Sequence, residues 1–576
     1  MSGNLNPGKA RLKRRFLPDT FSVTDLDSLR PYFTQLLDRQ ITTLEDAHRW
    51  LDDRSELSFV LEEEMAWRYI RMNCHTDNNE YSESFRYFVT ELEPQISRWS
   101  DQLDDKWLGL SLVSRMEAPE EKIVIRQIRN RHDLFREENV EIQAELQVLE
   151  QEYGKIASAM TVHVGGKELT LQQAANYLRQ NDRDLRREVF DKIAVRRLQD
   201  REVLQENFSL LVEKRSRIAR NAGFDHYRDY RFRELGRFDY TTEECFAFHD
   251  AVAATVVPLV NEINEKRKRK LGVDILRPYD LEVDPLNRPP LHPFSRIEEL
   301  VDKAITGLSR IDPRFGELLD YMNRNGFLDL ESRKNKAPGG FNYPLYEQNI
   351  PFIYMNATGN LRDLETMFHE GGHAVHSFLS SHLKWVENKE LPAEIAELAS
   401  MSMELLSMDY WDLWFSDPAS LRRAKREQLE GIVRILPWIA AIDRFQHLLY
   451  TTPGHSPEER NRIWLEIMDQ FGSDIVSWDE YDEYRAFYWQ TQLHLFEVPF
   501  YYIEYGIAQM GAIGVWRNYR NDPVTALKAY KKALSLGYTH PVPEIYRKAG
   551  IRFDFSQPYM QELMEFVKKE LNELED

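Results

Sequence analysis

Cysteine is scarce in this chain, whose 576 residues include only Cys74 and Cys245. Two cysteines cannot build the disulfide framework of a small secreted domain, so buried thiols in a reducing compartment are the simpler interpretation. The first twenty residues carry charges and Pro7 but lack the apolar segment of a signal peptide. We therefore expect a cytoplasmic protein.

Long apolar runs and an excess of positive charge are also missing. Since no stretch of about 18 apolar residues occurs, we expect no membrane-spanning helix. Lys and Arg number 75 against 95 Asp and Glu, a net charge of −20. This balance argues against nucleic acid and anionic membrane surfaces as partners, because both would be repelled. The remaining composition, 42% apolar and 30% charged, is typical of a globular protein.

Helical spacing of apolar residues runs through most of the sequence. It covers residues 1–150, 183–270 and 295–325, and it resumes from residue 361 to the end. Thr161–Leu169 interrupts it, because its alternating pattern around two glycines predicts a short β-hairpin. The sequence therefore predicts a mainly α protein, which we divide into an N-terminal helical region with a hairpin (1–200) and a catalytic region (201–576).

Two stretches before residue 361 have the composition of strands. They are 338–343 and 351–355, separated by a polar turn. They predict a small sheet beside the helix described next. The first stretch could present an unpaired edge to an extended peptide, and its glycines would allow close approach. The candidate substrate-binding residues are Gly339, Gly340, Phe341 and Asn342.

The motif that carries chemistry is His369-Glu370-Gly371-Gly372-His373. On a helix, the two histidines lie one turn apart on the same face, where they can bind one Zn²⁺ with Glu370 beside them. The alternative is two surface histidines without a metal. Two glycines inside a helix cost roughly 1 kcal/mol each, so a partner element packed against this backbone is expected.

A catalytic zinc usually has a third protein ligand, and the helix that follows Pro392 offers candidates. Glu394, Glu397 and Glu404 share one face of it. One of them could bind the metal while a neighbour orients a ligand imidazole. A solvated acidic face is the alternative, and spacing alone does not choose between Glu394 and Glu397.

At these residues the chain resembles the oligoendopeptidase F branch of the thimet-oligopeptidase-like zinc metallopeptidases. The resemblance rests on 369–376, on 356–363 before it, on 392–397 after it, and on His494 followed by 499–506. It implies a two-lobed helical shell around a deep substrate channel, and one Zn²⁺ per chain held by His369, His373 and Glu397. It also implies that Tyr502, Tyr505 and His494 assist catalysis by stabilising the oxyanion.

The function predicted in this way is zinc-dependent endopeptidase cleavage of short oligopeptides, with Glu370 as the general base. One alternative is a zinc hydrolase acting on a substrate other than a peptide. Another is a helical scaffold that has lost catalysis, against which the intact Glu370 argues. The oligomeric state is left open.

Overall fold

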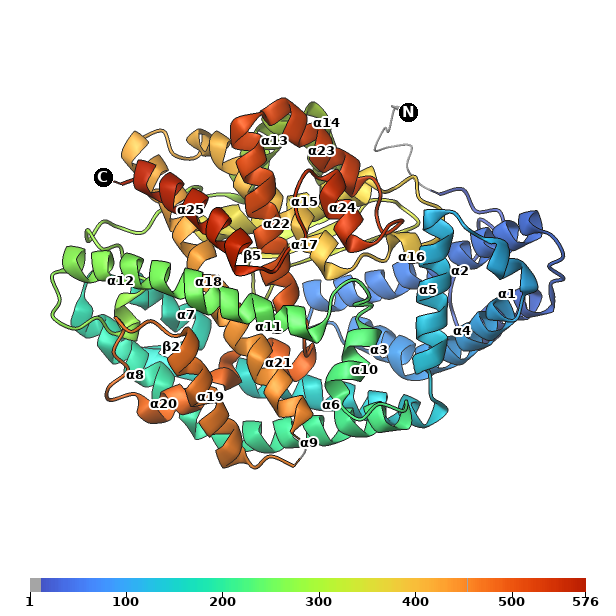
Figure 1. Cartoon of the computed structure of the whole chain (residues 1–576), viewed down its shortest axis with the longest axis horizontal. Helices are drawn as coiled ribbons and strands as arrows, with labels where there is room; N and C mark the ends of the chain where they lie inside the picture. The colour runs from blue at the N-terminus through green and yellow to red at the C-terminus, as the bar shows by residue number, and fades with distance from the viewer. Residues whose placement is uncertain (1–11, 453, 576) are drawn as a thin grey trace. The chain divides into compact units, whose positions relative to one another are not determined.

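A computed structural model describes residues 12–452 and 454–575, and in these residues helices dominate while strands are few and short (Figure 1). The predicted mainly α fold is therefore confirmed. The chain forms two compact units, each made of three segments. Unit 1 comprises the chain up to Phe135, His292–Leu421 and Gly511–Phe553; unit 2 comprises Arg136–Leu291, Arg422–Met510 and the chain from Asp554. The boundary predicted at residue 200 coincides with none of these segment ends and stays a prediction about sequence regions.

Unit 1 contains the His-Glu-x-x-His motif and a core of stacked aromatic side chains. Trp50 and Trp107 lie 5.4 Å apart between ring centroids and are nearly parallel, at the centre of the N-terminal helices. The helices of unit 1 are α1 (Leu26–Asp38), α2 (Leu44–Cys74), α3 (Asn79–Tyr87), α4 (Glu93–Leu108), α5 (Pro119–Leu134), α13 (Ile297–Ile311), α14 (Pro313–Arg324), α15 (Leu361–Leu379), α16 (Val386–Lys389), α17 (Ala393–Ser407), α23 (Pro523–Leu534) and α24 (Val542–Lys548).

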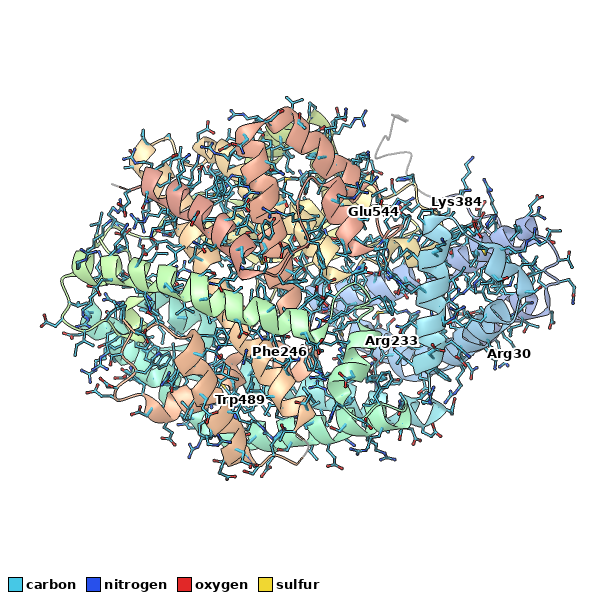
Figure 2. The ribbon with its side chains drawn as sticks, viewed as in Figure 1. Arg30, Arg233, Phe246, Lys384, Trp489 and Glu544 are labelled. Carbon is cyan, nitrogen blue, oxygen red and sulfur yellow. The ribbon has the colours of Figure 1, made fainter. Side chains whose placement is uncertain are left out.

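Unit 2 has its own aromatic core, in which Trp489 (labelled in Figure 2) stacks on Phe496 at 5.8 Å between centroids. Its helices are α6 (Glu137–Ser158), α7 (Leu171–Ala175), α8 (Arg183–Gln199), α9 (Arg201–Asn221), α10 (Tyr227–Glu234), α11 (Thr242–Ala251), α12 (Val257–Leu271), α19 (Pro457–Phe471), α20 (Asp482–Ala486), α21 (Leu493–Glu497) and α25 (Gln557–Glu573). Two further helices, α18 (Pro418–Thr451) and α22 (Tyr502–Asn521), contribute residues to both units.

The predicted hairpin is present in unit 2. Strands β1 (Thr161–Val164) and β2 (Lys167–Thr170) pair antiparallel, with Val164 opposite Lys167. Gly165 and Gly166 between them have φ of +57° and +78°. A two-residue turn with positive φ at both positions matches the twist of the strands, which is why glycine occupies both.

The small sheet of unit 1 has three strands in the order β3-β5-β4. Strand β4 (Phe341–Tyr343) pairs antiparallel with β5 (Phe352–Ala357), as the two predicted stretches suggest. Strand β3 (Leu328–Glu331) pairs parallel with β5 and was not predicted from the sequence. Its four residues lie at the end of a long helical stretch, where a short strand leaves little periodicity to detect.

One helical stretch of the described residues, Thr242–Leu271, is long and apolar enough to cross a membrane by length and composition. It consists of α11, a π-helical turn (Val252–Val256) and α12. Its side chains include Phe248, Val252 and Val256, which are fully buried in unit 2. A core helix passes the same test, so the expected absence of a membrane span stays a prediction.

Candidate active site

Helix α15 carries the motif, and a cap formed by Asn360 and Asp363 fixes where the helix starts. The side chain of Asn360 accepts a hydrogen bond from the backbone N–H of Asp363, and Asp363 Oδ2 accepts one from the N–H of Asn360 in return. The same oxygen also accepts from the N–H groups of Thr358 and Gly359, at 2.7 and 2.8 Å. These bonds satisfy donors that a helix N-terminus leaves unpaired, so the cap sets the register of the motif.

The glycine pair of the motif lies where α17 packs against α15. A Cβ atom on Gly372 would lie 2.6 Å from Ser400 Cα and 2.7 Å from the carbonyl oxygen of Ala399. Such distances are too short for any side chain, so this glycine lets two helix backbones touch. Gly371 differs, because a Cβ there would lie 3.8 Å from Leu308 Cδ1, an ordinary contact. The packed element expected from the sequence is therefore α17, and it presses on one glycine of the two.

The two motif histidines converge with Glu397 of α17. His369 Nε2 lies 3.3 Å from Glu397 Oε2, and His373 Nε2 lies 3.6 Å from the same oxygen. Donor atoms around a tetrahedral zinc with bonds of about 2.0–2.3 Å are roughly 3.3–3.8 Å apart. The three side chains therefore have the chemistry and the spacing of a catalytic zinc site with an open position.

A further acid of α17, Glu404, holds His369 from the other side of the ring. Glu404 Oε1 lies 2.7 Å from His369 Nδ1. A carboxylate in this position fixes the ring with Nε2 turned towards the metal position. Glu397 is held in turn by the Ser400 hydroxyl, which donates to Oε2 at 2.9 Å.

Glu394 is buried but lies outside this group of donor atoms. Its backbone carbonyl accepts a hydrogen bond from the hydroxyl of Tyr546, at 3.0 Å. Glu397, and not Glu394, therefore lies at the two histidines, and its role as the third metal ligand stays a prediction. Sequence reasoning counted Glu404 among the candidate ligands and orienting acids but did not single it out as the acid beside His369; its position seven residues after Glu397, two helical turns, is the signal that could have found it.

The carboxyl group of Glu370 is buried and only partly satisfied by hydrogen bonds. The residue is only 6% exposed, and its Oε2 has no hydrogen-bond partner among the described residues. Burial raises the pKa of its carboxyl to about 7. A buried carboxylate oxygen without a partner, beside a metal-type donor set, suits a group that exchanges a proton with a small molecule such as water.

The two histidines and Glu397 differ in how burial and neighbouring charges shift their pKa values. Burial favours neutral His373 and lowers its pKa to about 4. Burial also opposes charge on His369, but the hydrogen bonds that its ring donates to Glu397 and Glu404 outweigh this effect and raise its pKa. For Glu397, burial opposes ionisation, yet His373 and His369 lower its pKa to about 2. Glu397 is therefore ionised, as a metal ligand must be.

The predicted substrate strand lies next to α15. The side-chain amide of Asn342 donates to the backbone carbonyl of Glu370, at 3.1 Å. Strand β4 is the outer strand of its sheet, so Phe341 and Asn342 have one edge without a strand partner in the described residues. Gly339 has φ of +108°, a conformation that favours glycine, and a Cβ there would meet open space. A Cβ on Gly340 would lie 3.4 Å from the Tyr354 carbonyl oxygen.

The predicted oxyanion donors form a ring cluster of their own in unit 2. The ring of His494 lies 4.8 Å from that of Tyr502 and 5.9 Å from that of Tyr505, between centroids. Tyr502 and Tyr505 lie 5.5 Å apart on the first turn of α22. The roles of these three residues in catalysis stay predictions.

The backbone before α22 is held in an unusual conformation. Phe500 has φ of +65°, which is rare for a side chain of this size. Its N–H donates to Gln446 Oε1 at 2.6 Å, and its carbonyl oxygen accepts from Arg237. Arg237 is also paired with Glu504 at 2.9 Å. These buried contacts stabilise the conformation of the turn that precedes α22, the helix that carries Tyr502 and Tyr505.

The helical fold and this donor set define a metallohydrolase site of the His-Glu-x-x-His type. The chain belongs to Peptidase family M3: the model of that family matches residues 176–565, and the model of the Peptidase M3 N-terminal domain matches residues 16–135. The family predicted from the motifs is therefore confirmed.

Relatives of known name support the same assignment. The chain is 23% identical to oligopeptidase PepF of Bacillus subtilis (strain 168) over 418 residues, which is 71% of this chain and 60% of the relative. It is 21% identical to an oligoendopeptidase F homolog of Borreliella burgdorferi, covering 79% of this chain and 76% of the relative. A solved structure of PZ peptidase A with an inhibitor superposes with a TM-score of 0.90 at 25% identity, over 97% of this chain and 99% of that one.

Proposed function

We propose that this protein is a zinc-dependent endopeptidase that cleaves short oligopeptides, with the metal held by His369, His373 and Glu397. The observation that carries the proposal is the convergence of both motif histidines on one carboxylate oxygen, at 3.3 and 3.6 Å. The names of the relatives, oligopeptidase and oligoendopeptidase, support the substrate class.

A zinc ion bound there would act as a Lewis acid, polarising the scissile carbonyl and making water more acidic. Glu370 accepts the proton of the attacking water and passes it to the leaving amine. Its unpartnered, buried Oε2 is the atom for this transfer. Glu404 keeps His369 in the tautomer that leaves Nε2 free for the metal.

Two further parts of the chain complete the proposal. Tyr505, Tyr502 and His494 donate hydrogen bonds to the oxyanion that forms on the peptide carbonyl. The edge of β4 at Phe341 and Asn342, with Gly339 and Gly340 just before it, binds the peptide backbone as an added strand, which recognises main chain in preference to side chains.

We also propose that the protein works in the cytoplasm. Cys74 and Cys245 are both buried and form no disulfide. Thiols kept in this state are typical of a reducing compartment. Cell fractionation with an antibody to the protein tests this proposal.

The substitution Glu370→Gln tests the proposed function. We expect the variant to keep its zinc, measured by mass spectrometry, and to lose about 10²–10⁴-fold in hydrolysis of a quenched fluorescent peptide library. Glu365→Gln on the same helix is the matched control and should cleave normally. Unchanged turnover in Glu370→Gln would remove the general-base role, and failure of the wild-type zinc protein to cleave any peptide in the library would remove the function.

A further inference from the structure

A second group of metal-binding side chains lies in unit 2. Cys245 and His249 are four residues apart on α11, and Asp443 and His447 are four residues apart on α18. Side chains at this spacing share one face of a helix. All four residues are no more than 1% exposed. We call them the buried cluster.

The donor atoms of the buried cluster converge as those of a metal site do. Ligand atoms of Cys245, Asp443 and His447 all lie within 4.8 Å of one another, the same span that holds those of His369, His373 and Glu397. His447 Nε2 lies 3.1 Å from Asp443 Oδ2. His249 Nε2 lies 2.9 Å from the same oxygen, close enough to hold the carboxylate in place by a hydrogen bond.

Several polar atoms of the buried cluster lack partners. Among the described residues, Asp443 Oδ1 and His447 Nδ1 are buried without a hydrogen-bond partner, and His447 Nε2 makes no well-aligned hydrogen bond although it lies 3.1 Å from Asp443 Oδ2. Unpaired buried polar atoms are rare in native proteins and cost about 1–3 kcal/mol each. Because ligand atoms of Cys245, Asp443 and His447 also lie within 4.8 Å of one another, these unsatisfied atoms point to a ligand that accepts electron pairs.

The surroundings are apolar, so the charges of the cluster must balance within it. The ring of Phe246 (labelled in Figure 2) lies 4.9 Å from that of His447, and Phe232 and Phe500 lie at 5.8 and 5.3 Å. A divalent cation compensates the two negative charges of one thiolate and one carboxylate, and an uncompensated charge in such a place is costly.

We propose that the buried cluster is a second, structural metal site for Zn²⁺, with Cys245, Asp443 and His447 as ligands and His249 as the residue that orients Asp443. The thiol of Cys245 loses its proton to solvent as the sulfur–metal bond forms. The second oxygen of Asp443 offers a fourth donor. A thiolate with an imidazole and a carboxylate favours zinc over magnesium or calcium, which prefer oxygen ligands alone. The single Zn²⁺ per chain that the family resemblance implies is then the ion of the catalytic site, and the buried cluster would hold a second one.

The site has a structural use, because one of its proposed ligands, His447, contacts Phe500 in the turn that precedes α22. Phe500 packs edge-on against His447 and contacts Tyr450 at 5.5 Å. The backbone N–H of Phe500 also donates a hydrogen bond to the side chain of Gln446, the residue before His447. A metal bound to His447 would fix the ring on which Phe500 rests in its left-handed conformation.

Metal content separates the two sites. The variant His369→Ala/His373→Ala lacks both motif ligands, so any zinc that it keeps reports on the buried cluster. We expect about one zinc ion per chain after expression in zinc-supplied medium and dialysis, because a metal enclosed during folding exchanges slowly. Cys245→Ser in the same background should remove it, and Cys74→Ser, the other cysteine of the chain, should leave it in place.

Cobalt gives a spectroscopic signature that only the buried cluster can produce, since the catalytic ligands contain no sulfur. Protein expressed in minimal medium with Co²⁺ in place of zinc should show sulfur-to-cobalt charge-transfer absorption in the near ultraviolet. The band should persist in Cys74→Ser and vanish in Cys245→Ser.

The outcomes decide the proposal. It is overturned if the His369→Ala/His373→Ala protein folds, as judged by circular dichroism, and holds no metal. It is equally overturned if Cys245→Ser keeps full metal content and the cobalt band. Where Cys245→Ser does not fold, His447→Gln replaces it with the same expected loss of metal.

Discussion

The catalytic cluster (His369, His373, Glu397 and Glu404) and the buried cluster are built alike but differ in access to solvent. Each joins two helices, and each uses side chains one or two turns apart on a common face. The side chains of His369 and His373 are 21% and 19% exposed, whereas those of Asp443 and His447 are completely buried. Hydrolysis needs water and substrate at the metal, so the first arrangement can catalyse and the second can only hold structure.

The two clusters also use histidine and carboxylate in opposite roles. In the catalytic cluster the carboxylate of Glu404 orients the ring of His369. In the buried cluster the ring of His249 orients the carboxylate of Asp443. The pair of groups is the same, and its position decides whether the imidazole or the carboxylate faces the other donor atoms of the cluster.

The largest expected effect comes from removing a catalytic ligand. Glu397→Ala should reduce peptide hydrolysis to that of chelated protein, because the open metal site loses one of three protein donors. Glu394→Ala should retain hydrolysis and metal, since Glu394 lies outside the donor group. Zinc content and peptide cleavage of both variants are the measurements. Metal loss from Glu394→Ala with retention in Glu397→Ala would reverse the ligand assignment.

A smaller effect is expected from a residue of unit 2 that the proposed function assigns to the reaction. Tyr505→Phe should lower kcat by about 10²–10³-fold, with KM little changed, because it removes a hydrogen bond made mainly in the transition state. Steady-state kinetics on one quenched peptide measure both constants, with Tyr501→Phe as the neighbouring control. An effect confined to KM would rule out donation to the transition state and separate Tyr505 from the catalytic cluster.

Weakening the contact between Glu404 and His369 should reduce activity less than removing a metal ligand does. Glu404→Gln keeps the shape of the side chain but weakens its hold on His369 Nδ1, so zinc affinity should fall by about 10–100-fold. Competition with a chromogenic chelator measures this change. Activity should return when zinc is added in excess, which Glu397→Ala should not allow; activity that stays lost at saturating zinc would contradict a purely supporting role.

The smallest effect concerns the packing that brings α17 to the catalytic cluster. Gly372→Ala should destabilise the protein by about 1–3 kcal/mol, because the added methyl group meets the backbone of Ser400. Gly371→Ala should be neutral or stabilising by up to about 1 kcal/mol, since its site has room and alanine is the better helix former. Denaturant unfolding of both variants measures the difference. Equal stabilities would show that the backbone contact at Gly372 relaxes freely.

Local features of the fold were predictable because neighbouring residues determine them. The cap at Asn360 and Asp363, the hairpin turn at Gly165-Gly166 and the two strands before α15 all follow from short-range preferences, and all are present. Strand β3 escaped prediction because parallel pairing joins it to a strand more than twenty residues away, and four residues carry too little pattern.

The grouping of the site residues was predictable to a similar degree, while their roles stay predictions. The motif indicated His369, Glu370 and His373, the family resemblance implied Glu397, and the structure brings the two histidines and Glu397 together. The buried cluster was not recognised, because Cys245 and Asp443 lie on different helices almost two hundred residues apart. Their companions His249 and His447, each four residues on, were the available signal, but a pair at this spacing is common in helices without a metal.

The sequence by itself determined that α15 presents two histidines and a glutamate at one turn, because helix geometry fixes which side chains share a face. It also required a close neighbour at the glycine pair. Only the tertiary structure decided that Ser400 of α17 meets Gly372, and therefore that Glu397 and Glu404, rather than Glu394, reach the histidines. The register between two helices depends on how their surfaces pack, and no spacing within either helix contains it.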